Sequence, residues 1–163
     1  MYCSGNSPSK RLTSAMPSSQ TSRALSRNSA AKAINSYLES GSDNNNYEGL
    51  FETETTPTFP HSTPNLLDKK KDFDIIKYTP YGNRITTDFA LAALDGENLG
   101  KDSTTDFLAI SFSSTDYIGH KYGVNSKEVQ DAYIQLDRDL QRLLDTLDKK
   151  VGKDEYTVFL TAD

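Results

Sequence analysis

The last third of the chain carries the pattern that most constrains its fold, which is two short apolar runs separated by one long amphipathic segment. Residues 107–112 (FLAISF) predict a strand covered on both faces, and residues 156–161 (YTVFLT) predict a second strand. Between them, Asn125 and Glu128 form the pattern of a capping box, which predicts the start of a helix. Apolar side chains then recur at steps of three and four residues, at Val129, Ala132, Tyr133, Leu136, Leu140, Leu143, Leu144 and Leu147.

The order strand, helix, strand predicts an α/β fold, with a mostly parallel sheet flanked by helices. A helical crossover returns the chain to the starting edge of the sheet, so the two strands should run in the same direction. Their carboxyl ends then share one edge, which is where open α/β sheets bind ligands. We therefore expect a partial sheet whose functional residues follow the strand ends.

Two shorter elements are predicted upstream of this unit. Residues 73–78 (FDIIKY) predict a short strand, which ends at residues 80–83 (PYGN) because these hold a proline and a Gly-Asn turn signal. A helix is then expected to begin at a threonine cap, Thr86 or Thr87, and to stop near Gly96.

Three potential metal ligands follow the two predicted strands of the last third. The first strand continues into SSTDYIGH, which places Asp116 and His120 four residues apart, and the second continues into Asp163. A helical turn would put the Asp116 and His120 side chains on one face, where they could share one cation such as zinc. Asp163 could serve the same ion or a second one. The alternative is that Asp116 only caps a short helix and His120 only hydrogen-bonds at the surface.

Other polar residues near these positions are ambiguous. Ser113, Ser114 or Thr115 could be a nucleophile, but turn-forming or ligand-supporting roles fit as well, because no general base is visible nearby in the sequence. His61 lies in an irregular loop and is expected to be solvated or packed against that loop. No catalytic nucleophile is assigned.

Composition narrows the class of partner. The chain has a single cysteine, so a zinc site cannot be built from several thiolates and must use carboxylates and imidazoles. The net charge is −5, and the acid-free segment before Glu39 holds five basic residues, which leaves −10 on the remainder. This excess of negative charge repels the phosphates of nucleic acid and so disfavours nucleic acid as the main partner. A small anionic substrate is still allowed if a metal cation is bound in the site. No apolar stretch is long enough to predict a membrane span.

The chain is expected to divide near residue 36. Residues 1–36 are rich in Ser, Ala and Arg with few large apolar residues, so they predict a disordered or non-homologous head, with an organellar transit peptide as the alternative. Residues 37–72 hold turn formers and isolated aromatics, which is typical of a long irregular loop. Residues 37–163 are expected to form one fragment of a catalytic domain.

The segment DFLAISFSSTDYIGHKYGVNSKEVQDAYIQLDRDLQRLLDTLDKKVGKDEYTVFLTAD resembles the phosphate-irrepressible, PafA-like branch of the alkaline phosphatase superfamily, which is related in fold to type I phosphodiesterases and nucleotide pyrophosphatases. The segments DNNNYEGLFETETTPTFPH and FDIIKYTPYGN also look like this branch. The resemblance covers about residues 37–163, and the head before it has no match to this branch.

The resemblance implies a two-zinc phosphomonoesterase, usually periplasmic, that acts through a phosphorylated threonine. In this branch the Asp and His of the STDxxGH motif bind one zinc, and they correspond to Asp116 and His120. The Asp of the TADHG motif binds the other zinc and corresponds to Asp163. The nucleophile, the substrate-binding residues and the remaining zinc ligands of this branch match no position of the chain.

We therefore expect an internal fragment with an incomplete site that binds zinc weakly and is inactive alone. A small phosphate ester is the expected substrate, and oligomeric state is left open. A phosphodiesterase or nucleotide pyrophosphatase of the same superfamily is one alternative. A non-enzymatic α/β interaction module, whose acidic residues meet by accident, is the other.

Overall fold

A computed structural model describes residues 3–4, 42–44, 46–51, 54–61 and 73–162 of the 163-residue chain. Most of the regular secondary structure in these residues is helical. The elements in chain order are β1 (Cys3–Ser4), the short 3-10 helix η2 (Asp74–Tyr78), α3 (Pro80–Gly96), β2 (Phe107–Leu108), α4 (Ser114–Tyr122) and α5 (Lys127–Lys150). Within the described residues, no helix is both long enough and apolar enough to cross a membrane.

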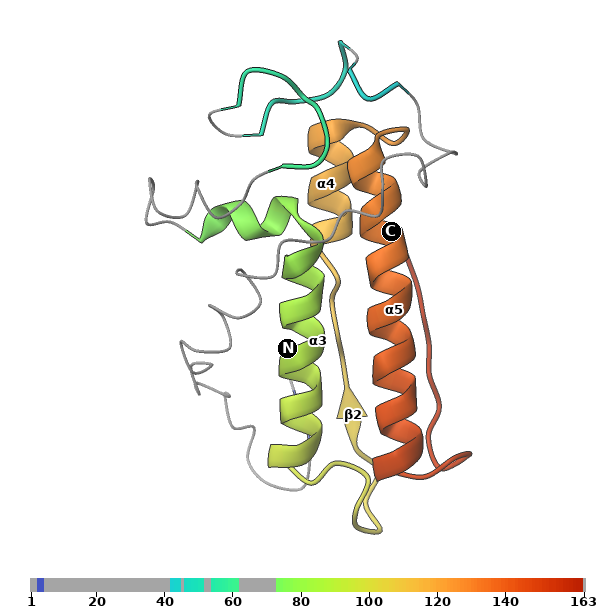
Figure 1. The fold of residues 1–163 in the computed structure, drawn as a ribbon. Coiled ribbons are helices and arrows are strands. Elements are labelled where there is room, and N and C mark those ends of the chain that lie inside the picture. The colour runs from blue at the N-terminus through green and yellow to red at the C-terminus, as the bar shows by residue number, and fades with distance from the viewer. Residues whose placement is uncertain (1–2, 5–41, 45, 52–53, 62–72, 163) are drawn as a thin grey trace.

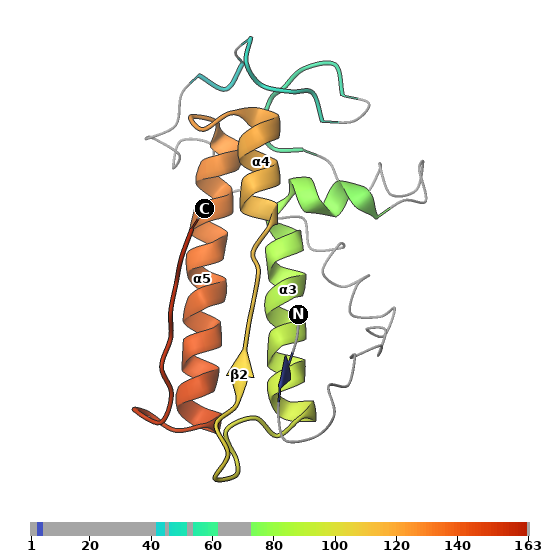
Figure 2. The same cartoon turned by 180° about the vertical axis from the view of Figure 1, so that it is seen from behind.

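The two long helices, α3 and α5, form the frame of the molecule. They stand side by side and run in the same direction. The segment that begins with β2 runs between them in the opposite direction and leads into α4 (Figures 1 and 2). After α5, residues 152–162 run back along that helix toward the end of the molecule where α4 lies. Residues 107–113 and 152–162 therefore follow the same direction, as the predicted crossover requires.

Helix α5 confirms the longest predicted helix, with a small shift in its cap. Its N-cap is Ser126 rather than Asn125, because the Ser126 hydroxyl accepts the Val129 backbone N–H at 3.2 Å. Glu128 does not close a capping box but contacts His61. Within the predicted apolar stripe, the buried residues are Val129, Ala132 and Leu143. Tyr133 and Leu144 stay exposed.

Helix α3 begins earlier than predicted. It starts at Pro80, whose ring fixes a helical φ and whose missing N–H is not needed in the first turn. Gly82 and Asn83 therefore lie inside the helix, so the predicted turn at residues 80–83 is wrong. Thr87 is not the cap either, because its hydroxyl donates to the Asn83 carbonyl at 3.1 Å within the helix. The predicted stop near Gly96 is confirmed.

The strand predicted at residues 73–78 is also wrong, since these residues form η2. The Ile76 N–H donates to the Phe73 carbonyl and the Thr79 N–H to the Ile76 carbonyl, each at 3.0 Å, so local turns satisfy the backbone. Ile75 is buried in the core, which explains the apolar pattern that looked like a strand.

The expected parallel sheet is not seen among the described residues. β2 holds only Phe107 and Leu108, and it pairs in an antiparallel manner with β1, with Cys3 opposite Leu108. Residues 156–161 do not form a strand in this structure, so the second predicted strand is not seen here. A strand needs neighbours for its N–H and C=O groups, and Phe159 and Leu160 are 85 % and 74 % exposed. Apart from Cys3–Ser4, the predicted head at residues 1–36 lies outside the described residues.

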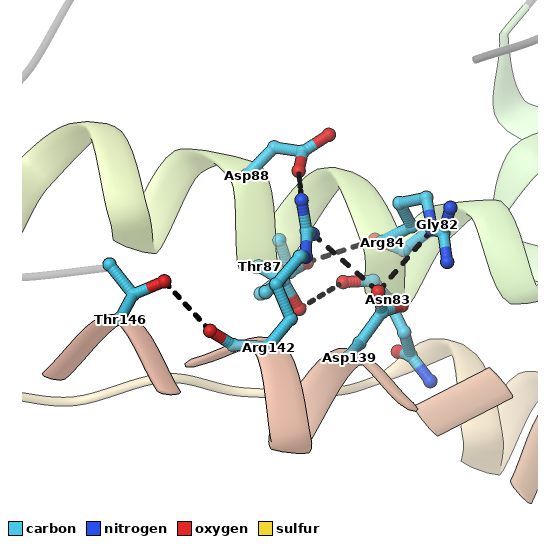
Figure 3. A network of polar contacts seen from close by, with 9 residues as sticks. Gly82, Asn83, Arg84, Thr87, Asp88, Asp139, Arg142 and Thr146 are labelled. Atoms are coloured by element: carbon cyan, nitrogen blue, oxygen red, sulfur yellow. Dashed lines mark hydrogen bonds and ion pairs between the residues drawn. The ribbon is translucent and has the colours of Figure 1, made fainter. Parts of the chain in front are cut away.

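Two sets of contacts hold the elements together, one apolar and one charged. The apolar cluster joins the loop before η2 to η2, α4 and α5, through Phe51, Ile75, Ile118, Tyr122, Val129 and Ala132. The charged part ties α3 to α5 (Figure 3). There Arg142 donates to Asp88 at 2.5 Å, and Asp139, only 1 % exposed, lies 3.3 Å from Arg84. The pKa of Asp139 is raised, because burial is the largest effect and the charge of Asp88 adds to it, although Arg84 and Arg142 lower it.

Candidate metal centre

The two STDxxGH positions lie together on α4. Asp116 is in the first turn of this helix and His120 in the last, one turn further along. The His120 Nε2 atom lies 3.3 Å from the Asp116 Oδ1 atom. The two side chains are 83 % and 71 % exposed, so they point out from the helical core rather than into it. The sequence prediction that they share one helical face is confirmed.

This separation suits two ligands of one zinc ion. Zinc lies about 2.0 to 2.2 Å from imidazole nitrogen and carboxylate oxygen, so two such ligands at neighbouring corners of a tetrahedron are about 3.3 to 3.5 Å apart. The pair therefore fits the zinc ion that the family resemblance implies. A zinc site needs three or four ligands, and the described residues hold no cluster of three or more His, Cys, Asp or Glu side chains that could bind a metal.

Asp163, the third predicted ligand, lies outside the described residues. The residues that precede it run in the direction of α4 (Figures 1 and 2). Its convergence with Asp116 and His120 therefore stays a prediction.

The hydroxyl residues before Asp116 contact protein groups. Ser114 is buried, and its backbone N–H donates to the Asn83 Oδ1 atom at 3.2 Å. The Thr115 hydroxyl oxygen accepts the Asn83 Nδ2–H at 2.8 Å. The Ser113 and Ser111 hydroxyls are 3.1 Å apart. These contacts favour supporting roles over nucleophilic ones.

Further contacts hold α4 against the rest of the molecule. The rings of Tyr117 and Tyr78 meet edge to face with centroids 5.9 Å apart, and the Lys121 ammonium lies 4.3 Å from the Tyr78 centroid. The Gly49 N–H donates to the Lys121 carbonyl at 2.8 Å. At the C-cap, Gly123 has a φ of +83°, which favours glycine. Packing and hydrogen bonds therefore fix the helix on which the candidate ligands lie.

His61 was expected to be solvated or packed against its loop, and the structure shows it packed. Its Nδ1 atom lies 2.7 Å from a Glu54 carboxylate oxygen and its Nε2 atom 2.9 Å from a Glu128 carboxylate oxygen. The ring is only 7 % exposed and stacks on Phe51 and Tyr122. Because both ring nitrogens contact carboxylates, neither is left to bind a metal.

The charge of His61 follows from these contacts. Burial lowers the pKa of the ring, but the hydrogen bonds and negative charges of Glu128 and Glu54 together outweigh burial and raise it above its ordinary value of 6.5. The raised pKa favours the protonated ring, which links the loop before η2 to α5 through Glu54 and Glu128. No sequence signal pairs it with Glu128, which is 67 residues away.

The chain is similar to known phosphoester hydrolases. It is 49 % identical over 134 residues to the alkaline phosphatase PafA of Elizabethkingia meningoseptica, and 48 % identical over 132 residues to a protein of Myroides odoratus named calcium-transporting ATPase. Each alignment covers 80 % of this chain and 24 % of the relative. A crystal structure of wild-type alkaline phosphatase PafA matches with a TM-score of 0.71 and 48 % identity, over 76 % of this chain and 24 % of that one.

The chain thus spans about a quarter of the length of the relatives it matches. Its structural neighbour has an α/β fold, although the described residues themselves are mostly helical. The profile of the type I phosphodiesterase and nucleotide pyrophosphatase family matches residues 15–163. This match includes Asp116 and His120 and most of the described residues. The chain belongs to the type I phosphodiesterase and nucleotide pyrophosphatase family, a family of phosphoric ester hydrolases in the alkaline phosphatase superfamily.

Proposed function

We propose that this chain forms part of a zinc-dependent phosphate monoesterase, in which Asp116 and His120 bind one zinc ion. The observation that carries the proposal is the pair itself, with ligand atoms 3.3 Å apart on an exposed face of a well-packed helix. The resemblance of STDxxGH to PafA-like alkaline phosphatases, and the similarity to PafA, support the choice of a monoester.

The remaining parts of the proposal come from the family resemblance. Asp163 is proposed to bind a second zinc ion, and a threonine outside this chain is proposed to carry the phosphoryl group. The segments at residues 107–112 and 156–161 are proposed to be neighbours in a mostly parallel sheet of the whole enzyme, in which their exposed apolar side chains would be covered. The whole enzyme is proposed to be periplasmic.

Zinc bound at such a site polarises phosphoryl oxygens and lowers the pKa of a bound hydroxyl. The part of this chain is to hold the ion, with a neutral imidazole nitrogen from His120 and a carboxylate oxygen from Asp116. The exposure of both side chains leaves space for ligands from outside the chain and for a phosphate oxygen. Two ligands alone bind zinc weakly, so we propose that the isolated chain has no phosphatase activity.

A phosphodiesterase is the second candidate function. The observation that favours it is the family profile, whose description names diester and pyrophosphate substrates. The metal chemistry is the same in both cases, and the two differ in the groups that contact the second substituent on phosphorus. Turnover of an aryl phosphate against that of a bis-aryl phosphate, measured on the whole enzyme, separates them.

The chain offers a direct test of metal binding because it has only two histidines. In a ¹H–¹³C correlation spectrum, His61 and His120 each give one ring Cε1–H signal. On titration with Zn²⁺, the His120 signal should move and saturate, while the buried His61 signal should stay in place. The variant Asp116→Asn should weaken the His120 response about tenfold, because it removes the charged ligand. A His120 signal that does not respond to millimolar Zn²⁺ would exclude the proposed zinc site on α4.

A further inference from the structure

The first turn of α4 has no cap of its own. Its N-cap residue, Ser113, has helical backbone angles and makes no side-chain hydrogen bond to the helix. The backbone N–H groups of a first helical turn have no partner within the helix, so an uncapped start frays. Asp116 lies in this turn. Its position therefore depends on whatever fixes Ser114 and Thr115.

A side chain from another helix takes the place of the cap. Asn83 of α3 accepts the Ser114 backbone N–H through Oδ1 at 3.2 Å, and its Nδ2–H donates to the Thr115 hydroxyl at 2.8 Å. Both halves of one amide are thus used on two consecutive residues of α4. Asn83 is only 1 % exposed, so water does not compete for these bonds.

The neighbouring glycine allows this close approach. A Cβ atom at Gly82 would lie 2.0 Å from the Ser114 Oγ atom and 3.2 Å from its Cβ atom, so only glycine lets α3 lie this close to the start of α4. The Gly-Asn pair that suggests a turn in the sequence is instead the contact between two helices.

We propose that Asn83 is a positioning residue for the zinc ligand Asp116. It acts through the backbone and hydroxyl of the two residues before Asp116, which it holds in the helical geometry that brings the carboxylate to His120. This inference rests on the proposed function, since it assumes that the Asp116 and His120 pair binds zinc.

The zinc titration of the two histidine signals measures the effect. In Asn83→Ala, the zinc dissociation constant read from His120 should rise about fivefold, the change expected for the loss of one helix cap. In Asn83→Asp it should stay within about twofold of the wild-type chain, because a carboxylate can accept from both the Ser114 N–H and the Thr115 hydroxyl. The His61 signal reports in each case that the fold is intact.

Thr87→Ala is the matched control. Thr87 is fully buried on the same helix and its hydroxyl donates to the Asn83 carbonyl within α3, so its loss weakens the core but leaves both Asn83 side-chain bonds to α4 in place. Its zinc affinity should equal that of the wild-type chain. Thr115→Val is the second test, because it removes one of the two Asn83 bonds without opening a cavity. It should weaken zinc binding about two- to threefold.

The outcomes separate the two proposals. A wild-type His120 signal that does not respond to Zn²⁺ overturns the metal site and this inference with it. A normal wild-type response with an unchanged dissociation constant in Asn83→Ala overturns the inference alone. Equal weakening in Asn83→Ala and Thr87→Ala also overturns it, because the effect would then be general loosening. If Asn83→Ala does not fold, Thr115→Val decides: weaker binding supports the inference and unchanged binding overturns it.

Discussion

The regions around His61 and His120 place the same side chain in opposite surroundings. His61 is 7 % exposed, with a carboxylate on each ring nitrogen and aromatic rings stacked on it. His120 is 83 % exposed, with one carboxylate 3.3 Å away on its own helix. In the first arrangement, both ring nitrogens of His61 have partners within the protein. The second leaves the His120 ring open to an ion and to ligands from elsewhere.

Burial and the number of carboxylate partners distinguish a structural histidine from a candidate metal ligand. A buried ring between two acids contributes to the free energy of unfolding, because removing it leaves a carboxylate without a partner in a low-dielectric place. An exposed ring beside one acid contributes little stability, since water replaces its contacts. The exposed ring can instead bind an ion.

The largest expected effect is on stability, from His61→Ala. We expect a loss of about 3 to 5 kcal/mol in the free energy of unfolding, because Glu128 stays buried without its partner. Urea unfolding followed by circular dichroism measures it. Glu54→Gln is the control and should cost less, because Glu54 is 26 % exposed and water can reach it. A loss below about 1 kcal/mol in His61→Ala would show that the ring is not a structural link.

The second prediction concerns the packing of α3 against the start of α4, the helix that carries His120. Gly82→Ala should cost about 1 to 3 kcal/mol, because its Cβ would meet Ser114. Gly96→Ala is the matched control on the same helix. Nothing lies within 4 Å of a Cβ there, so it should be neutral or stabilise by up to about 1 kcal/mol. Equal effects of the two substitutions on the thermal midpoint would contradict the close packing of α3 on α4.

The third prediction is a pH dependence that belongs to His61. Its folded-state pKa is raised above 6.5, so its contribution to stability is complete below about pH 6.5 and is lost as pH rises through the raised value. The charged groups that act on His61 are Glu54, Glu128 and Asp43. Unfolding midpoints from pH 5.5 to 9 should fall in the wild-type chain and stay flatter in His61→Gln. A wild-type midpoint that rises over this range would contradict the assigned charge.

The smallest expected effect is that of His120→Ala on stability. The free energy of unfolding should change by less than about 0.5 kcal/mol, because the ring is exposed. The same substitution should also abolish any stabilisation that Zn²⁺ gives the wild-type chain. Unfolding curves with and without Zn²⁺ check both parts. A large loss of stability without zinc would break the contrast between the two histidines.

The sequence by itself determined the features that depend on local spacing. The three- and four-residue steps from Val129 to Leu147 specify one buried helical face, and α5 follows them with its cap displaced by one residue. Asp116 and His120 meet because residues four apart on a helix are neighbours whatever the rest of the chain does. The family resemblance also rests mainly on the local sequence of residues 106–163.

Tertiary structure decided the features that depend on distant partners. An apolar run becomes a strand only where neighbours pair with its backbone, and residues 73–78 instead close local turns while residues 156–161 have no strand partner among the described residues. Gly82 and Asn83 support α4 only because a helix from elsewhere lies against them. His61 finds Glu128 across 67 residues of sequence. The local pattern of apolar residues carries no information about such pairings. Which side chains are buried, and which charged groups find partners, is decided only when the helices and loops pack together.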